Sequence, residues 1–438
     1  MSMNKHDHKP SVLEVWLNQV RVGTITNLPY DRNLFVFTED YIANTDRPTL
    51  SLSLADAKGD LITQPQEVQT KVPSFFSNVL PEGHLREYLA KRGNIKEARE
   101  FFLLWLLGVD LPGAVLVQDA EGRPLPLAED SFLRESKRNP PDQVLRFSLA
   151  GVQLKFSAVG QPNKGLTIPV EGRGGHWIVK LPSQKQLRVP ENEYSMMRFA
   201  AAVGIDVAEV GLIPTNEIYG LPAEMAQDKS NALYVKRFDR TPDGARIHTE
   251  DFNQVYGQFP EAKYKNFSYG NMAGDIWRVL GEQGLTEFIK RLVYTAAIGN
   301  ADMHLKNWSL IYRDGKTPAL APAYDFVSTI QYRGFDETLA LSIAKEKDPR
   351  YLDIELLDRF AVKARVPTSL VRDVALATAE SIVKKWPELA GTLPFDAEWV
   401  ERINEQLKYV PITAQFLPTA AGQKSPKRPR PRRDRAPA

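Results

Sequence analysis

The chain has 438 residues, of which 43% are hydrophobic and 25% charged, a balance typical of globular proteins with a sizeable core. It contains no cysteine, which excludes disulfides, thiolate metal sites and a cysteine nucleophile and fits a reducing, cytoplasmic location. The N-terminus has no apolar signal core and no run of eighteen apolar residues occurs, so we expect neither secretion nor a membrane span.

The formal net charge of +2 is unevenly distributed along the chain. The last fifteen residues, KSPKRPRPRRDRAPA, hold seven Lys or Arg and one Asp, which leaves the rest of the chain with a charge of −4. The body is therefore not a basic nucleic-acid-binding surface. The Pro/Arg-rich tail, residues 419–438, is expected to be disordered. Contact with nucleic acid or an acidic partner, and a plain solvated tail, both stay open.

Residues 10–120 are expected to form a strand-rich N-terminal subdomain. VLEVWLNQVRVGTIT alternates apolar and polar residues around LNQ, which predicts a hairpin, and NLFVFT and TLSLSL continue the period of two. NIKEAREFFLLWLLG predicts an amphipathic helix that ends at Gly108, and PGAVLVQD predicts another strand. Charged, Pro-rich residues from about 119 to 142 indicate a linker.

Residues 140–239 are again strand-rich, and residues 240–416 are mainly helical. QVLRFSLAGVQLKFSAVG predicts two strands around a turn, and HWIVKLPS and ALYVKRFDR predict one strand each. ENEYSMMRFAAAVGI predicts a helix with acids in its first turn, which suits the macrodipole. Apolar positions with a period of 3.6 predict later helices in GDIWRVLGEQG, LTEFIKRLVYTAAIG, YLDIELLDRFAVKAR, SLVRDVALATAESIVKKW and AEWVERINEQLKYV. Strands followed by helices indicate an α+β fold.

The stretch GNADMHLKNWSLIY, residues 299–312, carries the first chemical signal. Asp302 and Asn307 have the D-x-x-x-x-N spacing of the protein-kinase catalytic loop. Phosphoryl transfer needs a carboxylate beside the attacking hydroxyl, and an oxygen ligand for the Mg²⁺ that neutralises the phosphates. Taken alone, the spacing is equally compatible with a polar turn after a helix.

A second carboxylate, Asp325 in LAPAYDFVST, lies eighteen residues beyond Asn307. The intervening WSLIYRDGKTPALAPAYD predicts a hairpin with an Asp-Gly turn, which returns Asp325 to a place beside Asn307. Asp-Phe is similar to the metal-binding dipeptide of protein kinases, although Val327 stands where those have glycine. The returning hairpin favours kinase chemistry over a polar turn.

The upstream lobe offers a lysine and a covering loop. Lys180, in the strand HWIVKLP, is placed like the strand lysine that reaches the α/β-phosphates. Glu193, thirteen residues later, pairs with Lys180 or merely favours its helix N-terminus. FSLAGVQLKFS offers a one-glycine turn for phosphates, with a plain hairpin as the alternative. His304 and Lys306 could face the γ-phosphate, and the scatter of the other histidines argues against zinc at His304.

The ordered set of motifs resembles the HipA-like serine/threonine kinases, the toxin partners of bacterial HipBA toxin–antitoxin modules. The carrying motifs are RFSLAGVQLKFS, HWIVKLPS, ENEYSMM, YVKRFDR, NADMHLKNWSLIY and PAYDFVST, preceded by VWLNQVRVG, TLSLSL, FFSNVLPEG and PGAVLV. They cover nearly the whole chain up to about residue 416. The tail from Thr419 onward does not match the family pattern.

The resemblance implies a two-lobed protein-kinase-like fold with an extra N-terminal subdomain, the nucleotide ATP and the ion Mg²⁺. It implies that Asp302 is the catalytic base, that Asn307 and Asp325 hold the metal, and that Lys180 contacts the nucleotide phosphates. The remaining nucleotide-binding residues that it implies are Ala150, Gly151, Val152, Gln153, Lys155, Lys236, Phe238, His304, Lys306 and Tyr324. Ser148 would be an inhibitory autophosphorylation site, because a dianion beside a phosphate site repels ATP.

The same resemblance implies growth arrest through phosphorylation of a cytosolic protein, with aminoacyl-tRNA synthetases as the known substrate class. It implies a helix-turn-helix antitoxin of the HipB type as partner and, through it, operator DNA, with no membrane contact. Two alternatives stay open: a small-molecule kinase with the same catalytic parts, and a catalytically silent corepressor of an antitoxin–DNA complex. The retained Asp302, Asn307 and Asp325 argue against the second.

Overall fold

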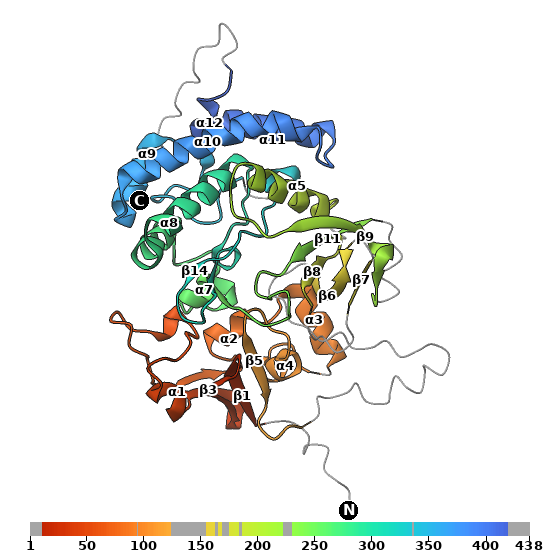
Figure 1. Cartoon of the computed structure of the whole chain (residues 1–438), viewed down its shortest axis with the longest axis vertical. Helices are drawn as coiled ribbons and strands as arrows, with labels where there is room; N and C mark the ends of the chain where they lie inside the picture. Colours follow the sequence, from red (N-terminus) through yellow and green to blue (C-terminus); the bar gives the residue numbers. More distant parts are fainter. Residues whose placement is uncertain are drawn as a thin grey trace, which may run out of the picture.

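The computed structural model describes residues 11–93, 95–123, 155–162, 165–168, 175–183, 186–221, 230–334 and 337–418. Figure 1 shows the red and orange elements as one body, the yellow and olive strands as a second, and the teal and blue helices as a third. The α+β prediction, with strands first and helices later, is confirmed. Outside the described residues lie most of the predicted linker, Ser148, residues 150–153 and the tail 419–438.

The N-terminal subdomain is built on a five-stranded antiparallel sheet in the order β4-β3-β2-β1-β5. Its strands are β1 (Val12–Leu17), β2 (Val20–Leu28), β3 (Arg32–Phe37), β4 (Gln66–Gln69) and β5 (Val115–Asp119). Its helices are α1 (Glu39–Ala43), α2 (Ser74–Asn78), α3 (Gly83–Arg92) and α4 (Glu100–Leu107). The predicted hairpin at LNQ is confirmed. Asn18 in its turn adopts φ 54°, a left-handed conformation that Asn tolerates.

Two predictions in this subdomain are wrong. TLSLSL is not a strand, because Leu52–Leu54 form a 3-10 helix. The carboxylate of Glu250 accepts hydrogen bonds from Ser51 Oγ (2.5 Å) and Leu52 N (3.0 Å), so a distant residue takes the donors that a sheet would have used. The helix predicted in NIKEAREFFLLWLLG is present with Gly108 as its C-cap, as predicted, but it begins only at Glu100, and because all of its residues are buried it is not amphipathic.

The second body carries a six-stranded sheet in the order β10-β7-β6-β8-β11-β9. Its strands are β6 (Lys155–Gln161), β7 (Gly165–Thr167), β8 (Trp177–Lys180), β9 (Val210–Pro214), β10 (Ile218–Tyr219) and β11 (Asn231–Lys236). Helix α5 (Val189–Ala202) follows β8, and its Met196 and Phe199 join the core of the helical body. The helix therefore connects the two bodies.

The third body is helical around a three-stranded sheet in the order β12-β13-β14. Its helices are α7 (Phe252–Val255), α8 (Tyr269–Ala297), α9 (Ile354–Ala364), α10 (Thr368–Ala390), α11 (Ala397–Tyr409) and α12 (Pro411–Ala414). Its strands are β12 (His248–Asp251), β13 (Ser309–Tyr312) and β14 (Ala319–Leu320). The two helices predicted before residue 298 are one element, α8, interrupted at Gly281, whose φ of 64° and ψ of −150° are not helical.

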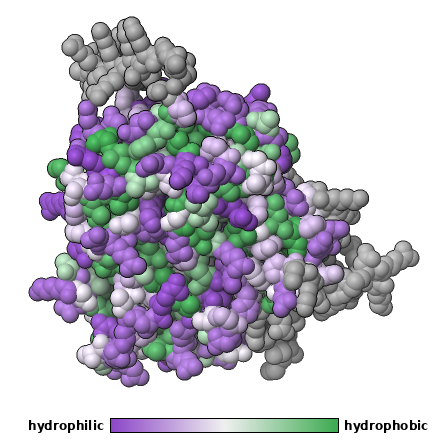
Figure 2. Space-filling model, turned by 45° about the horizontal axis from the view of Figure 1, so that its top comes forward, coloured by the Kyte–Doolittle hydropathy of each residue, from purple (hydrophilic) through white to green (hydrophobic). Residues whose placement is uncertain are grey.

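The face of the molecule in Figure 2 is mainly hydrophilic, with smaller hydrophobic areas between the charged residues. None of the helices within the described ranges is long and apolar enough to cross a membrane. Large aromatic side chains such as Trp308, Phe326 and Tyr294 are instead buried in the core of the helical body. This core supports the loops that follow α8 and β14, where the candidate site lies.

Candidate active site

The loop that follows α8 begins with a glycine that no other residue replaces without strain. Gly299 has φ +62°, and a Cβ atom on it would lie 2.6 Å from Ile330 Cγ2. After it, Asn300 Oδ1 accepts a hydrogen bond from Asp302 N at 2.9 Å. The glycine and the asparagine together turn the chain so that Asp302 leaves the helix end.

Asp302 is exposed at the surface of this loop, where an incoming hydroxyl group can reach it. The hydroxyl of Tyr264 donates a hydrogen bond to Asp302 Oδ1. Desolvation by the surrounding protein raises the pKa of the Asp302 carboxyl. The Tyr264 hydrogen bond and the charge of Lys263 oppose that rise. The tyrosine therefore both orients the carboxylate and favours its charged form.

Asn307 lies at the other end of the loop and is fixed by its own amide group. Its Nδ2 donates a hydrogen bond to the carbonyl oxygen of Asp302 at 2.8 Å, and its backbone N bonds to the carbonyl of His304 at 2.9 Å. Because the amide nitrogen is used in this way, the carboxamide oxygen is the atom left to face a cation.

The hairpin predicted after Asn307 is confirmed, since β13 and β14 pair antiparallel with Leu310 opposite Leu320. It brings the next residues back to the loop: Tyr324 Oη donates a hydrogen bond to the carbonyl of Lys306 at 2.9 Å. The following residue, Asp325, has φ +58°, a conformation that is strained for a non-glycine residue and is often found at functional sites.

Lys180 connects the two lobes. Its Nζ lies 2.5 Å from Glu193 Oε1, the carboxylate that the sequence predicts as its partner, and also bonds to Asp325 Oδ1. Although burial disfavours its charge, the carboxylates of Asp325 and Glu193 raise the pKa of Lys180. Burial alone would raise the pKa of Asp325, but Lys180 and Lys155 lower it, so this carboxylate is ionised.

Lys155 lies opposite Lys180 on the neighbouring strand β6. Burial lowers the pKa of Lys155 to about 8, partly offset by the charge of Asp325. Two lysines on adjacent strands, next to an ionised carboxylate, form an arrangement suited to phosphate groups with a bound cation.

His304 is buried within the same loop. Its Nδ1 has no hydrogen-bond partner among the described residues, and its ring packs edge-on against Tyr264 with centroids 4.9 Å apart. Burial lowers the pKa of His304 to about 3, so the ring is neutral near pH 7. It is therefore able to donate or accept a hydrogen bond but brings no charge to a phosphate.

Lys306 is held by the N-terminal subdomain. Its Nζ lies 2.8 Å from Glu82 Oε1 and donates a hydrogen bond to the carbonyl of Asn78 at 2.9 Å. Contact of this ammonium with a phosphate, as the sequence predicts, requires it to leave both partners.

Three of the predicted nucleotide-binding residues, Phe238, Tyr324 and Lys236, are only partly brought together. The rings of Phe238 and Tyr324 pack with centroids 5.7 Å apart at the side of the site where the two lobes meet. Lys236 instead lies at the surface, where it pairs with Glu209 at 3.0 Å. Residues 150–153, the predicted phosphate-binding loop, lie outside the described residues.

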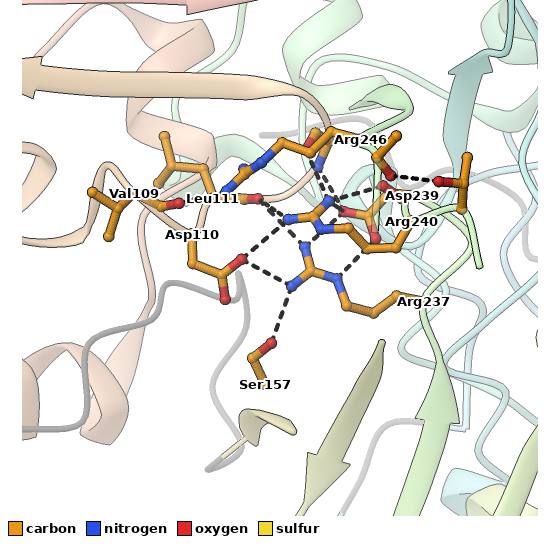
Figure 3. A network of polar contacts seen from close by, with 11 residues as sticks. Val109, Asp110, Leu111, Ser157, Arg237, Asp239, Arg240 and Arg246 are labelled. Atoms are coloured by element: carbon orange, nitrogen blue, oxygen red, sulfur yellow. Dashed lines mark hydrogen bonds and ion pairs between the residues drawn. The ribbon is translucent and has the colours of Figure 1, made fainter. Parts of the chain in front are cut away.

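Sequence reasoning missed the polar network that follows β11, which we call the hinge junction: Asp110, Arg237, Asp239 and Arg240 (Figure 3). Asp110 Oδ1 accepts hydrogen bonds from Arg237 Nη1 (3.2 Å) and Arg240 Nη2 (3.1 Å). Asp239 Oδ2 accepts from both arginines, at 2.8 and 2.9 Å, and from the backbone N of Gly113 at 2.8 Å.

The hinge junction joins all three parts of the chain. Asp110 follows α4 in the N-terminal subdomain, and Arg237 also bonds to Ser157 Oγ on β6 at 3.2 Å. None of its four charged side chains is more than 9% exposed. Arg237, Asp239 and Arg240 all lie in the motif YVKRFDR, but Asp110, the acid that the two arginines also bind, is more than a hundred residues away.

The described part of the chain has no group of three or more His, Asp or Glu residues arranged to hold a metal ion. Mg²⁺ is usually bound by one or two protein oxygens together with phosphate oxygens and waters. The amide oxygen of Asn307 and the ionised Asp325 are a donor set of that kind. The residues present therefore fit Mg²⁺ delivered with a nucleotide better than a metal caged by protein alone.

Comparisons with known proteins agree along the chain. Residues 147–386 match the family model of the HipA-like C-terminal domain, and residues 13–118 match that of the HipA N-terminal domain. The chain is 48% identical to "Putative kinase Y4dM" of Sinorhizobium fredii over 414 residues, which cover 93% of this chain and 99% of the relative. It is 26% identical to "Serine/threonine-protein kinase toxin HipA" of Shewanella oneidensis, over 88% of this chain and 91% of the relative.

A solved structure shares the fold. It is a HipA chain in a complex of HipA, HipB and operator DNA from Shewanella oneidensis, with a TM-score of 0.68, 22% identity, and coverage of 92% of this chain and 96% of that one. The two-lobed architecture with its additional N-terminal subdomain is therefore that of a known fold.

Proposed function

The chain belongs to the family of HipA-like kinases, and on that premise we propose that it transfers the γ-phosphate of ATP to a serine or threonine hydroxyl of a protein. The observation that carries this proposal is the position of Lys180, held between Glu193 of one lobe and Asp325 of the other. A lysine paired with a helix glutamate, and an aspartate beside the catalytic loop, are the arrangement that phosphoryl transfer uses.

The protein's own groups perform the transfer as follows. Asp302, exposed in its loop, accepts the proton of the substrate hydroxyl as the oxygen bonds to the γ-phosphorus. The bond between that phosphorus and the oxygen bridging to the β-phosphate breaks, and ADP leaves. Lys180 contacts the phosphates and offsets their negative charge, while Glu193 keeps its ammonium in place.

We propose that Asn307 and Asp325 hold Mg²⁺, which neutralises the charge of the phosphates. Lys155 and the loop 150–153 contribute further phosphate contacts, and Phe238, Tyr324 and Lys236 border the base. His304 and Lys306 lie beside Asn307, with His304 as a neutral hydrogen-bonding group. Ser148 is the proposed inhibitory autophosphorylation site, since a phosphate there would repel ATP.

The biological part of the proposal rests on the relatives. One is named a toxin, and the structural neighbour is a complex with HipB and operator DNA. We therefore propose a cytoplasmic toxin that phosphorylates a translation component, such as an aminoacyl-tRNA synthetase, and arrests growth. A HipB-like helix-turn-helix antitoxin would neutralise it and connect it to operator DNA.

Incubation with ATP labelled on its γ-phosphate tests the proposal. Purified protein, Mg²⁺ and a cell lysate are expected to give label on a discrete protein, and the Asp302→Asn variant is expected to give none. Label on a small molecule other than ATP and free phosphate, with none on protein, favours the small-molecule kinase. If the folded wild-type protein transfers no label to any acceptor, the corepressor alternative stands and the proposal is wrong.

A further inference from the structure

The N-terminal subdomain contacts the catalytic loop through Glu82, the N-cap residue of α3. Its carboxylate binds two lysines of the helical body, Lys263 at 2.9 Å and Lys306 at 2.8 Å. We call these three residues the catalytic-loop junction. The two ammonium groups overcome the effect of burial and lower the pKa of Glu82 to about 2, so it is charged at neutral pH.

One arm of this junction fixes the middle of the catalytic loop. The Lys306 side chain is only 4% exposed, and its ammonium also bonds to the carbonyl of Asn78. Both atoms that hold its ammonium, Glu82 Oε1 and the Asn78 carbonyl oxygen, belong to the N-terminal subdomain. The backbone of Lys306, by contrast, directly precedes Asn307 in the candidate site. A buried ammonium that lost its carboxylate would be left with a single carbonyl.

The second lysine of the junction, Lys263, connects Glu82 to the proposed base, Asp302. Lys263 directly precedes Tyr264, whose hydroxyl donates the hydrogen bond to Asp302 Oδ1. The backbone carbonyl of Lys263 also accepts a hydrogen bond from Leu305 N at 3.2 Å, which ties this segment to the catalytic loop a second time. Glu82 therefore contacts, through one residue on each side, the segments that carry Asp302 and Asn307.

We propose that Glu82 is a positioning residue of the catalytic loop, so that the N-terminal subdomain completes the geometry of the active site. This rests on the proposed phosphoryl transfer at Asp302. Glu82 does not touch substrate or nucleotide; it holds Lys263 and Lys306, and through them the base and the metal-holding amide. Small displacements of such groups reduce the rate of the chemical step more than the binding of substrate.

The chain offers a matched control at the same boundary. Lys71 of the N-terminal subdomain pairs with Glu261 of the helical body at 2.5 Å. Among the described residues, neither member of this exposed pair lies in the catalytic loop or forms a hydrogen bond with Asp302. Glu261→Gln removes a carboxylate between the same two parts of the protein without releasing Lys306.

Two measurements on the full chain are compared for Glu82→Gln and Glu261→Gln. In phosphate transfer, Glu82→Gln is expected to lower kcat about tenfold while KM for ATP changes less than about twofold. In hydrogen exchange followed by mass spectrometry, its residues 300–308 are expected to exchange faster than in the wild type. Glu261→Gln is expected to alter neither quantity.

An unchanged kcat and unchanged exchange in residues 300–308 of Glu82→Gln would overturn the inference. The exchange measurement needs no activity, so it decides the role of Glu82 even if the wild type transfers no phosphate and the proposed function fails. If Glu82→Gln does not fold, Lys263→Gln replaces it. Faster exchange in the same loop then supports the inference, and wild-type exchange contradicts it.

Discussion

The hinge junction and the catalytic-loop junction have the same arrangement of charges but differ in how deeply their acids are buried. In each, one acid of the N-terminal subdomain binds two bases of the rest of the chain: Asp110 binds Arg237 and Arg240, and Glu82 binds Lys263 and Lys306. The side chain of Asp110 is fully buried, whereas that of Glu82 is 17% exposed.

The deeply buried junction uses arginines and the more exposed one uses lysines. The planar guanidinium groups of the hinge junction are shared between Asp110 and a second acid, Asp239, so their geometry is fixed by several bonds at once (Figure 3). The lysines of the catalytic-loop junction end in compact, rotatable ammonium groups. The first junction is therefore suited to holding the lobes together and the second to setting the position of a loop.

Asp110→Ala tests the hinge junction and should have the largest effect on the free energy of unfolding. It leaves two buried arginines with fewer acceptors, and breaking a buried ion pair usually costs about 3–5 kcal/mol. We expect a loss of that size in the free energy of unfolding, measured by urea denaturation. A loss below about 1 kcal/mol, the value for exposed pairs, would show that the hinge junction is not structural.

Glu250, a third acid at the boundary, predicts a pH dependence. It is buried against Ser51, Leu52 and Tyr312, and burial raises its pKa from 4.5 to about 7, although these hydrogen bonds oppose the rise. The folded state then keeps a proton that the unfolded state has lost, so stability falls as the pH rises from about 4.5 to about 7.

The neutral variant Glu250→Gln cannot titrate and isolates this effect. Its stability relative to the wild type should increase through that pH range, by up to about 3 kcal/mol, and stay constant above it. Denaturation of both proteins at several pH values between 4 and 8 measures the difference. A difference independent of pH would mean that folding does not change the pKa of Glu250.

Glu261→Gln should have the smallest effect on stability. Its pair with Lys71 is on the surface, with side-chain exposures of 33% for the lysine and 68% for the glutamate, and such pairs contribute about 0–1 kcal/mol. Thermal unfolding of the variant is expected to match that of the wild type closely. A loss comparable with that of Asp110→Ala would remove the distinction between deep and surface contacts at this boundary.

The sequence predicts the local parts of this site and not its long-range contacts. The loop from Asp302 to Asn307, the hairpin before Asp325 and the strand of Lys180 follow from spacing and periodicity over fewer than thirty residues. Tyr264 and Glu82 could not be found in this way, because Tyr264 is 38 residues from Asp302 and the segment of Glu82 more than 200 residues from Lys306.

The errors in the fold have the same origin. The alternation in TLSLSL is that of a strand. Glu250, 199 residues from Ser51, nevertheless accepts hydrogen bonds from Ser51 Oγ and Leu52 N, and a 3-10 turn forms instead. The apolar residues of α4 read as one face of a helix, but the surrounding subdomain covers every side. Local preference gave way in both cases to contacts between distant segments.

Phosphate transfer by Asp302→Asn is the most direct test of the central claim that Asp302 is the base of a phosphotransferase. The substitution keeps the shape of the side chain and its bond to Tyr264, so folding and ATP binding should be close to those of the wild type. With saturating Mg²⁺ and ATP, we predict that kcat falls at least about 100-fold, the usual size of a general-base effect. A folded, ATP-binding Asp302→Asn protein with wild-type kcat would contradict the account.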